Sequence, residues 1–192
     1  RLLLYEGYVM HKLMNLICVG NKNSIGLVVF LSTFFGLVAC QAGPEVLSTP
    51  IMGYNHTPAA INEFTVNGAG GPNLGPHQGG GGQVCCGVIP KYWVPGLEAI
   101  VEWEIDPNPK AELKRDRYGS LDMQDYRRHA KNYTHHKAVV EIPRYERPGP
   151  IRVHFLPCNQ VRVTAAATSP GYPGYPYNYP MVMERVAECP KK

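Results

Sequence analysis

The sequence predicts a mainly β domain, a β-sandwich-like antiparallel fold with one amphipathic helix; a small α+β domain is the alternative. Residues 97–105, LEAIVEWEI, alternate between apolar and polar side chains, which is typical of a half-buried antiparallel strand. The 20 glycines and 18 prolines interrupt long helices and favour short strands joined by turns. A single segment, 120–133, has helical spacing, so we expect one helix lying on a sheet.

Several other segments have the pattern of short strands. Residues 60–67 alternate and end at the turn dipeptide Asn67–Gly68. The apolar run 84–90, VCCGVIP, predicts a buried strand. Three further alternating segments complete the set, with the last two expected to form a hairpin: 137–143, 150–157 and 160–166.

The helix near 120–133 is predicted from its start signal and its apolar spacing. Ser120 is a candidate N-cap, and Asp122 follows in the first turn, where a negative charge is favourable. The residues expected on the apolar face recur at helical spacing: Met123, Tyr126, Ala130 and Tyr133.

Two segments have a composition typical of irregular structure. The glycine-rich stretch 68–83 lacks the GK[ST] of a phosphate-binding loop, and Pro72 interrupts any dinucleotide fingerprint. We expect a flexible loop there, with a binding role as the alternative. Residues 169–180, SPGYPGYPYNYP, are rich in Pro and Tyr and predict an extended strap on the surface. After the strap, 182–189 could form one short helical turn.

The N-terminal region has the features of a secretory leader. The apolar run 25–39 is shorter than the about 20 residues of a membrane-spanning helix, and Lys12 and Lys22 precede it. Residues 37–40, LVAC, resemble the bacterial lipobox, in which the cysteine receives a lipid and the chain is cut before it; a buried or transmembrane helix is the alternative. Gln41 after Cys40 favours the outer membrane, facing the periplasm.

These features divide the chain into three parts. Residues 1–39 are the predicted signal peptide with upstream residues, 40–50 a lipidated tether, and 51–192 a single globular domain that includes the strap. The formal net charge is +4, and loss of the leader brings it closer to neutral, so composition gives no indication of nucleic-acid binding.

Four cysteines follow Cys40: Cys85, Cys86, Cys158 and Cys189. An even number in an oxidising compartment favours disulfides. A Cys85–Cys86 bridge is ranked last because it closes an eight-membered ring. Closing a loop such as Cys158 to Cys189 would stabilise the fold by roughly 3–4 kcal/mol in the chain-entropy model. Buried free thiols and a metal site are the alternatives, although VCCG is not a CxxC pair.

No pattern of catalytic residues stands out, so we predict that the protein is not an enzyme. There is no GxSxG motif. Cys86 and His77 could form a nucleophilic pair, but a cysteine of a secreted protein is expected to be oxidised. The acids Glu98, Glu102 and Glu104 share one strand face. They could include the carboxylate pair of a glycosidase, but solvent-exposed acids on a sheet have the same pattern. The histidines that could suggest a metal do not form a convincing set: His129, His135, His136 and His154. We therefore expect no cofactor, no metal and no small-molecule substrate.

Five sequence blocks resemble a family of bacterial envelope lipoproteins that was long described only as a domain of unknown function. The blocks are YNHT (54–57), FTVNGAGGPN (64–73), GGGGQVCCGVIPKYWVPGL (79–97), VEW (101–103) and IPRYERPGPIRVHFLPCNQVRV (142–163). Members of that family are found beside type VI secretion phospholipase effectors, and some act as their immunity proteins.

The resemblance implies a periplasm-facing lipoprotein that binds and neutralises a cognate lipase effector. The alternatives are a structural or assembly lipoprotein that binds another envelope component, and a hydrolase using Glu102 or His154. The candidate partner-binding residues are on the predicted helix, together with the glycine-rich loop: Tyr126, Arg127, Arg128 and Tyr133. Arg and Tyr are enriched at binding hot spots. The other expected partner is the membrane, through the lipid on Cys40.

Overall fold

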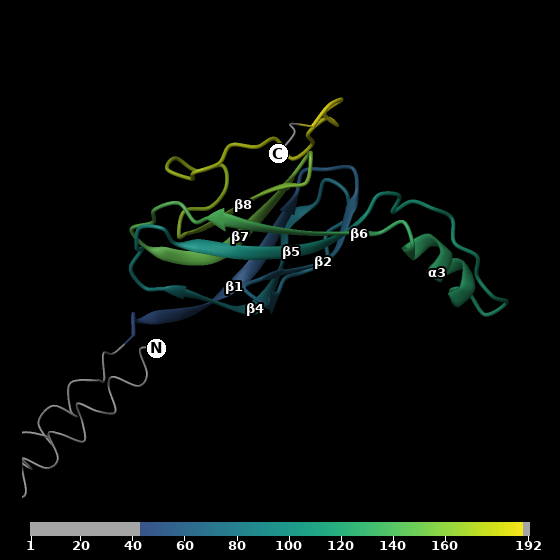
Figure 1. Ribbon diagram of the computed structural model, residues 1–192, viewed down its shortest axis with the longest axis horizontal. Helices are drawn as coiled ribbons and strands as arrows, with labels where there is room; N and C mark the ends of the chain where they lie inside the picture. Colours follow the sequence, from purple (N-terminus) through teal and green to yellow (C-terminus); the bar gives the residue numbers. More distant parts are fainter. Residues whose placement is uncertain (1–42, 190–192) are drawn as a thin grey trace, which may run out of the picture. The chain divides into compact units, whose positions relative to one another are not determined.

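The computed structural model in Figure 1 describes residues 43–189 and contains two four-stranded β-sheets. In sheet A the strand order is β4-β1-β7-β8, and in sheet B it is β3-β2-β5-β6. The strands of sheet A are β1 (Val46–Asn55), β4 (Gly79–Pro90), β7 (Pro148–Leu156) and β8 (Gln160–Ala166). Those of sheet B are β2 (Ala60–Val66), β3 (Ala69–Gly70), β5 (Glu98–Asp106) and β6 (Thr134–Glu141). The predicted mainly β, sandwich-like fold is confirmed.

The core lies between the facing sides of the two sheets. On β5, Ala99, Val101 and Trp103 are buried while the residues between them are exposed, as the alternation at 97–105 predicts. Phe64 of β2 meets Phe155 of β7 edge to face, with ring centroids 5.1 Å apart. This contact joins the two sheets, because each contributes one ring. Burial of aromatic side chains from both layers is a main source of sandwich stability.

One strand pair is parallel, which the antiparallel prediction missed. β1 pairs antiparallel with β4 on one side, and parallel with β7 on the other, in the register Ile51 to Ile151. The parallel pairing is possible because the chain builds sheet B between these two strands. The predicted hairpin of β7 and β8 is confirmed.

Strand β1 occupies a central position in sheet A, although the sequence did not predict it. It begins at Val46, so residues 46–50 of the expected tether belong to the sandwich. Pro50 and Gly53 weaken its strand signal. The predicted leader and the lipid site at Cys40 lie outside the described residues. Within 43–189, no helix is long and apolar enough to cross a membrane.

Part of the expected glycine-rich loop is also β structure. Residues 69–70 form β3, and β4 begins at Gly79, ahead of the predicted start at 84. β4 is an edge strand of sheet A. Val84 is therefore 39% and Val88 57% exposed, and the prediction of a buried strand at 84–90 is correct only for residues such as Ile89.

The helix is shorter than predicted and does not lie on a sheet. Helix α3 spans Met123–Ala130, and its N-cap is Asp122 instead of Ser120. Figure 1 shows it beyond the end of the sandwich, in the connection between β5 and β6. The prediction of a helical turn at 182–189 is wrong, since that segment contains no helix.

Candidate functional site

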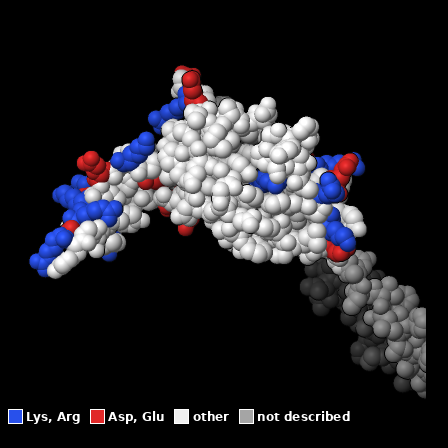
Figure 2. Space-filling model, turned by 180° about the vertical axis from the view of Figure 1, so that it is seen from behind, with Lys and Arg blue, Asp and Glu red and all other residues white. Residues whose placement is uncertain are grey.

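The connection between β5 and β6, residues 107–133, forms an arm that extends beyond the end of the sandwich (Figure 1). Figure 2 shows Lys and Arg side chains gathered on this arm, whereas most of the sandwich surface in that view has no charge. All four predicted partner-binding residues, Tyr126, Arg127, Arg128 and Tyr133, are on the arm.

Hydrogen bonds accepted by two aspartates fix α3 within the arm. The Asp122 carboxylate accepts hydrogen bonds from the backbone N–H groups of Gln124 (2.8 Å) and Asp125 (3.0 Å). These bonds lower the pKa of Asp122, because they favour the charged carboxylate. The bond from the Asp125 N–H has the larger effect. The buried Asp125 accepts a hydrogen bond from the Lys114 N–H (2.9 Å) and pairs with Arg128. The helix is thereby tied to the irregular segment of the arm that precedes it.

A histidine at the end of α3 anchors the arm to the sandwich. His129 Nε2 lies 3.0 Å from Asp106 Oδ2 at the end of β5, and both side chains are less than a tenth exposed. The ring of Tyr133 meets His129 edge to face, with centroids 5.4 Å apart. Partial burial, together with the nearby charge of Asp106, raises the pKa of the Tyr133 hydroxyl.

The four predicted partner-binding residues therefore differ in how far their side chains are exposed to solvent. The side chains of Arg127 and Arg128 are exposed, although Arg128 also pairs with Asp125. Tyr126 and Tyr133 are half-buried. The glycine-rich segment, the other candidate contact, lies instead in β3, in the start of the edge strand β4 and in the connection between them.

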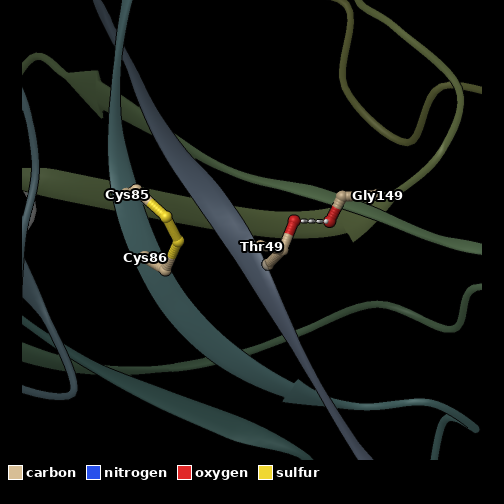
Figure 3. The surroundings of a disulfide bond; sticks show 4 residues. All are labelled: Thr49, Cys85, Cys86 and Gly149. Carbon is tan, nitrogen blue, oxygen red and sulfur yellow. Dashed lines mark hydrogen bonds between the residues drawn. A yellow bond between two sulfur atoms is a disulfide. The ribbon is translucent and has the colours of Figure 1, made fainter.

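The four cysteines within residues 43–189 form two disulfides. Cys158–Cys189 closes the loop that was expected. The other pair, Cys85–Cys86, is the connectivity that the sequence ranked last, and that ranking is wrong. The two residues lie on β4 beside Thr49 of β1, as Figure 3 shows. The β1–β4 register shifts between Thr49 and Ile51, so the neighbours in β4 do not alternate as they do in a regular strand.

The acids on β5 form ordinary cross-strand contacts on the outer face of sheet B. Glu102 pairs with Lys137 of β6 at 2.8 Å. Glu104 accepts a hydrogen bond from Asn62 of β2 at 2.8 Å and lies 3.5 Å from His135. Each of these two acids thus has a basic neighbour on β6. Among residues 43–189, no group of three His, Cys, Asp or Glu side chains could hold a metal ion.

Sequence reasoning missed a buried chain of hydrogen bonds between His56, His154 and Tyr175. His56 Nε2 lies 2.9 Å from His154 Nδ1, and His154 Nε2 lies 2.5 Å from the Tyr175 hydroxyl. His56 Nδ1 lies 2.9 Å from the carbonyl oxygen of Pro180. The chain therefore joins sheet A to both ends of the Tyr-rich part of the strap.

The direction of every bond in this chain follows from its last acceptor. The Pro180 carbonyl can only accept, so His56 Nδ1 must donate to it. A neutral His56 then accepts at Nε2 from His154 Nδ1–H. A neutral His154 accepts in turn at Nε2 from the hydroxyl of Tyr175. With both imidazoles neutral, this arrangement satisfies all three groups.

Burial favours that neutral state. Desolvation lowers the pKa of His154 to about 3, and the neighbouring His56 and Arg152 act in the same direction. Desolvation also lowers the pKa of His56. It raises the pKa of the Tyr175 hydroxyl strongly and that of Tyr177 to about 12. This cluster therefore fastens the strap through groups that burial keeps uncharged.

The comparisons identify the family. The model of the family described as "Protein of unknown function (DUF3304)" matches residues 54–163, which is more than half of the chain, so this protein belongs to that family. The match includes the sandwich from the end of β1 to β8 and the arm, and it stops before the strap. Comparison with curated proteins and with solved structures finds no match.

Proposed function

We propose that this protein is a periplasm-facing lipoprotein of the outer membrane that binds and neutralises a secreted lipase effector. The observation that supports binding is the arm: a charged extension tied to a rigid sandwich by the His129–Asp106 contact. The lipobox-like LVAC and the resemblance to immunity lipoproteins support the location and the kind of partner. On this proposal the protein acts by occupying the effector, without chemistry of its own.

The arm suits the recognition of an acidic surface. Its Lys and Arg residues outnumber its acids, and one of the acids, Asp125, is buried. The basic residues are Lys110, Lys114, Arg115, Arg117, Arg127, Arg128 and Lys131. A fixed basic surface speeds association with an acidic partner, and an element that is ordered before binding loses less entropy on contact. A lipid anchor would raise the concentration of the inhibitor at the membrane that the effector attacks.

On this proposal a phospholipase gene lies beside this one. The test measures phospholipid hydrolysis by that enzyme, with increasing amounts of purified protein. We expect full inhibition at equimolar protein. Arg127→Glu reverses an exposed charge on α3 and should raise the half-inhibitory concentration at least tenfold. Arg144→Glu, between β6 and β7 at the other end of β6, is the matched control and should inhibit like the wild type.

A lipase that stays fully active with excess protein contradicts the proposal. If the protein co-purifies from cells with another envelope component in place of the lipase, it is an assembly lipoprotein. If both arginine variants inhibit normally, the effector is neutralised but does not contact Arg127.

A further inference from the structure

A cavity of about 480 Å³ opens at one end of the sandwich, and nothing in the proposed function uses it. Both sheets contribute to its inner wall, which includes Ile61 of β2, Trp103 of β5 and Phe155 of β7. The β7–β8 turn, Cys158–Asn159, forms one side. Its volume is within the range of about 300–1,000 Å³ that is typical of small-molecule sites.

The residues after the strap, 181–189, form the outer wall and are held in place on both sides. The Met183 N–H donates to the His56 carbonyl oxygen at 3.1 Å, and Cys189 is bonded to Cys158. Between these two attachments lie Arg185 and Val186, which line the cavity. The cavity is thus bounded on this side by a covalently fixed segment.

The lining is mostly apolar, with a single positive charge and four uncharged polar residues, Thr57, Thr134, Asn159 and Gln160. Besides the core residues, Ile105, Leu156 and Val186 face the cavity, and Arg185 is the one charged residue among the lining positions. Arg185 forms no ion pair with a carboxylate in the described part of the chain. A ligand that satisfies this lining has an apolar body and an anionic end, because guanidinium groups bind carboxylate and phosphate oxygens in pairs.

We infer that this cavity binds a single-chain anionic amphiphile, with its acyl chain against the Trp103 wall and its head group at Arg185. A free fatty acid and a lysophospholipid with an anionic head share this chemistry. The inference stands on the cavity and is independent of the arm, so either proposal can fail alone.

The test is a fluorescence titration of the purified protein with cis-parinaric acid, a fluorescent 18-carbon carboxylic acid. We expect saturable binding of one equivalent. Palmitate and lysophosphatidylglycerol compete as the two candidate ligands: the stronger competitor identifies the source of the head group. Hexadecanol has the chain without the charge and should compete about fivefold more weakly.

Two variants with matched controls locate the site. Ala59→Phe adds a ring at the cavity wall and should weaken binding at least tenfold, whereas Ala111→Phe, on the arm, should have no effect. Arg185→Gln should weaken parinarate about fivefold and leave hexadecanol unchanged; Arg144→Gln is its control. Thermal unfolding of each variant checks that it is folded.

The inference is overturned if parinarate shows no saturable binding, or if folded Ala59→Phe binds it as tightly as the wild type does. Equal competition by hexadecanol and palmitate would show that Arg185 has no part in recognition, and would overturn the anionic assignment.

Discussion

At the scale of single residues, two outward-facing side chains of β7 fasten the strap. His154 points away from the sandwich core, yet it is only 3% exposed because the tyrosines of the strap cover it. Arg152 donates hydrogen bonds to the carbonyl oxygens of Ala166 (2.8 Å) and Thr168 (3.1 Å) at the approach to the strap. Buried polar groups of this kind are stable only while every partner stays in place.

His154 should make the protein less stable in mild acid. The ionisable groups around it are His56 and Tyr54 from β1 and its end, Arg152 on β7, and Tyr175, Tyr177 and Tyr179 of the strap. Its pKa is about 3 in the folded state, whereas an ordinary histidine has a pKa of 6.5, so the unfolded chain binds the proton first as pH falls. Stability is complete above about pH 6.5 and decreases below it.

We expect the free energy of unfolding to fall by about 2 kcal/mol from this residue between pH 7 and pH 5. Urea unfolding at the two pH values measures it. His154→Gln is less stable at pH 7 but should lose less on acidification. The control His135→Gln, whose ring is largely exposed, should keep the wild-type loss. Equal losses in the wild type and His154→Gln would contradict the prediction.

At the scale of elements, regular alternation identifies a strand well but does not tell whether that strand lies in the centre of its sheet. The outer face of β5 is polar except for Ile100 and its inner face is apolar, so its pattern reads directly as a half-buried strand. β1 lies between β4 and β7, but Pro50 and Gly53 break its pattern. Its place depends on partners distant in the chain, which no local pattern contains.

The arm, the histidine chain and the cavity likewise differ in how well the sequence predicts them. The arm residues are close in sequence, so helical spacing groups them correctly on one element. The histidine chain joins residues 56 and 154, and its third member lies in a segment with no regular structure. The cavity likewise depends on where Cys189 is pinned. Contacts of this kind follow from the complete topology and cannot be predicted from periodicity.

The attachment of α3 should depend on His129. His129→Ala removes a buried contact with a carboxylate, an interaction that contributes about 1.5–3 kcal/mol. We expect trypsin to cut the arm at its Lys and Arg residues about tenfold faster, while the sandwich stays intact. Mass spectrometry of timed digests measures the rate. Gln124→Ala, on the exposed face of α3, is the control, and an unchanged rate in His129→Ala would show that the helix is held by other contacts.

At the scale of the domain from residue 44 onward, the C-terminal segment packs against the outer face of sheet A near β7. The strap covers the outward residues of β7, and Cys189 beyond it is bonded to Cys158 in the β7–β8 turn. Sheet A is thus covered on both faces near β7, by sheet B inside and by the strap outside. This explains why every residue of β7 from Ile151 to Leu156 is buried.

The Cys158–Cys189 bond should therefore contribute much more to stability than the bond between the adjacent cysteines. It links residues 31 positions apart, and the chain-entropy model gives about 3–4 kcal/mol for a loop of that length. Replacing both cysteines by serine should lower the free energy of unfolding by that amount. Cys85→Ser with Cys86→Ser is the matched control: it restrains almost no chain, so its loss should be less than half as large.

Urea unfolding of the two double variants at pH 7.5 compares these losses. Parinarate binding by the Cys158→Ser/Cys189→Ser protein gives a second readout, because the released segment includes Arg185 and Val186 of the cavity. Stability and binding should decrease together in that variant and binding should stay unchanged in the control. Similar losses of stability in both variants would mean that the strap is held mainly by His154, Arg152 and their hydrogen bonds, and that the disulfide adds little.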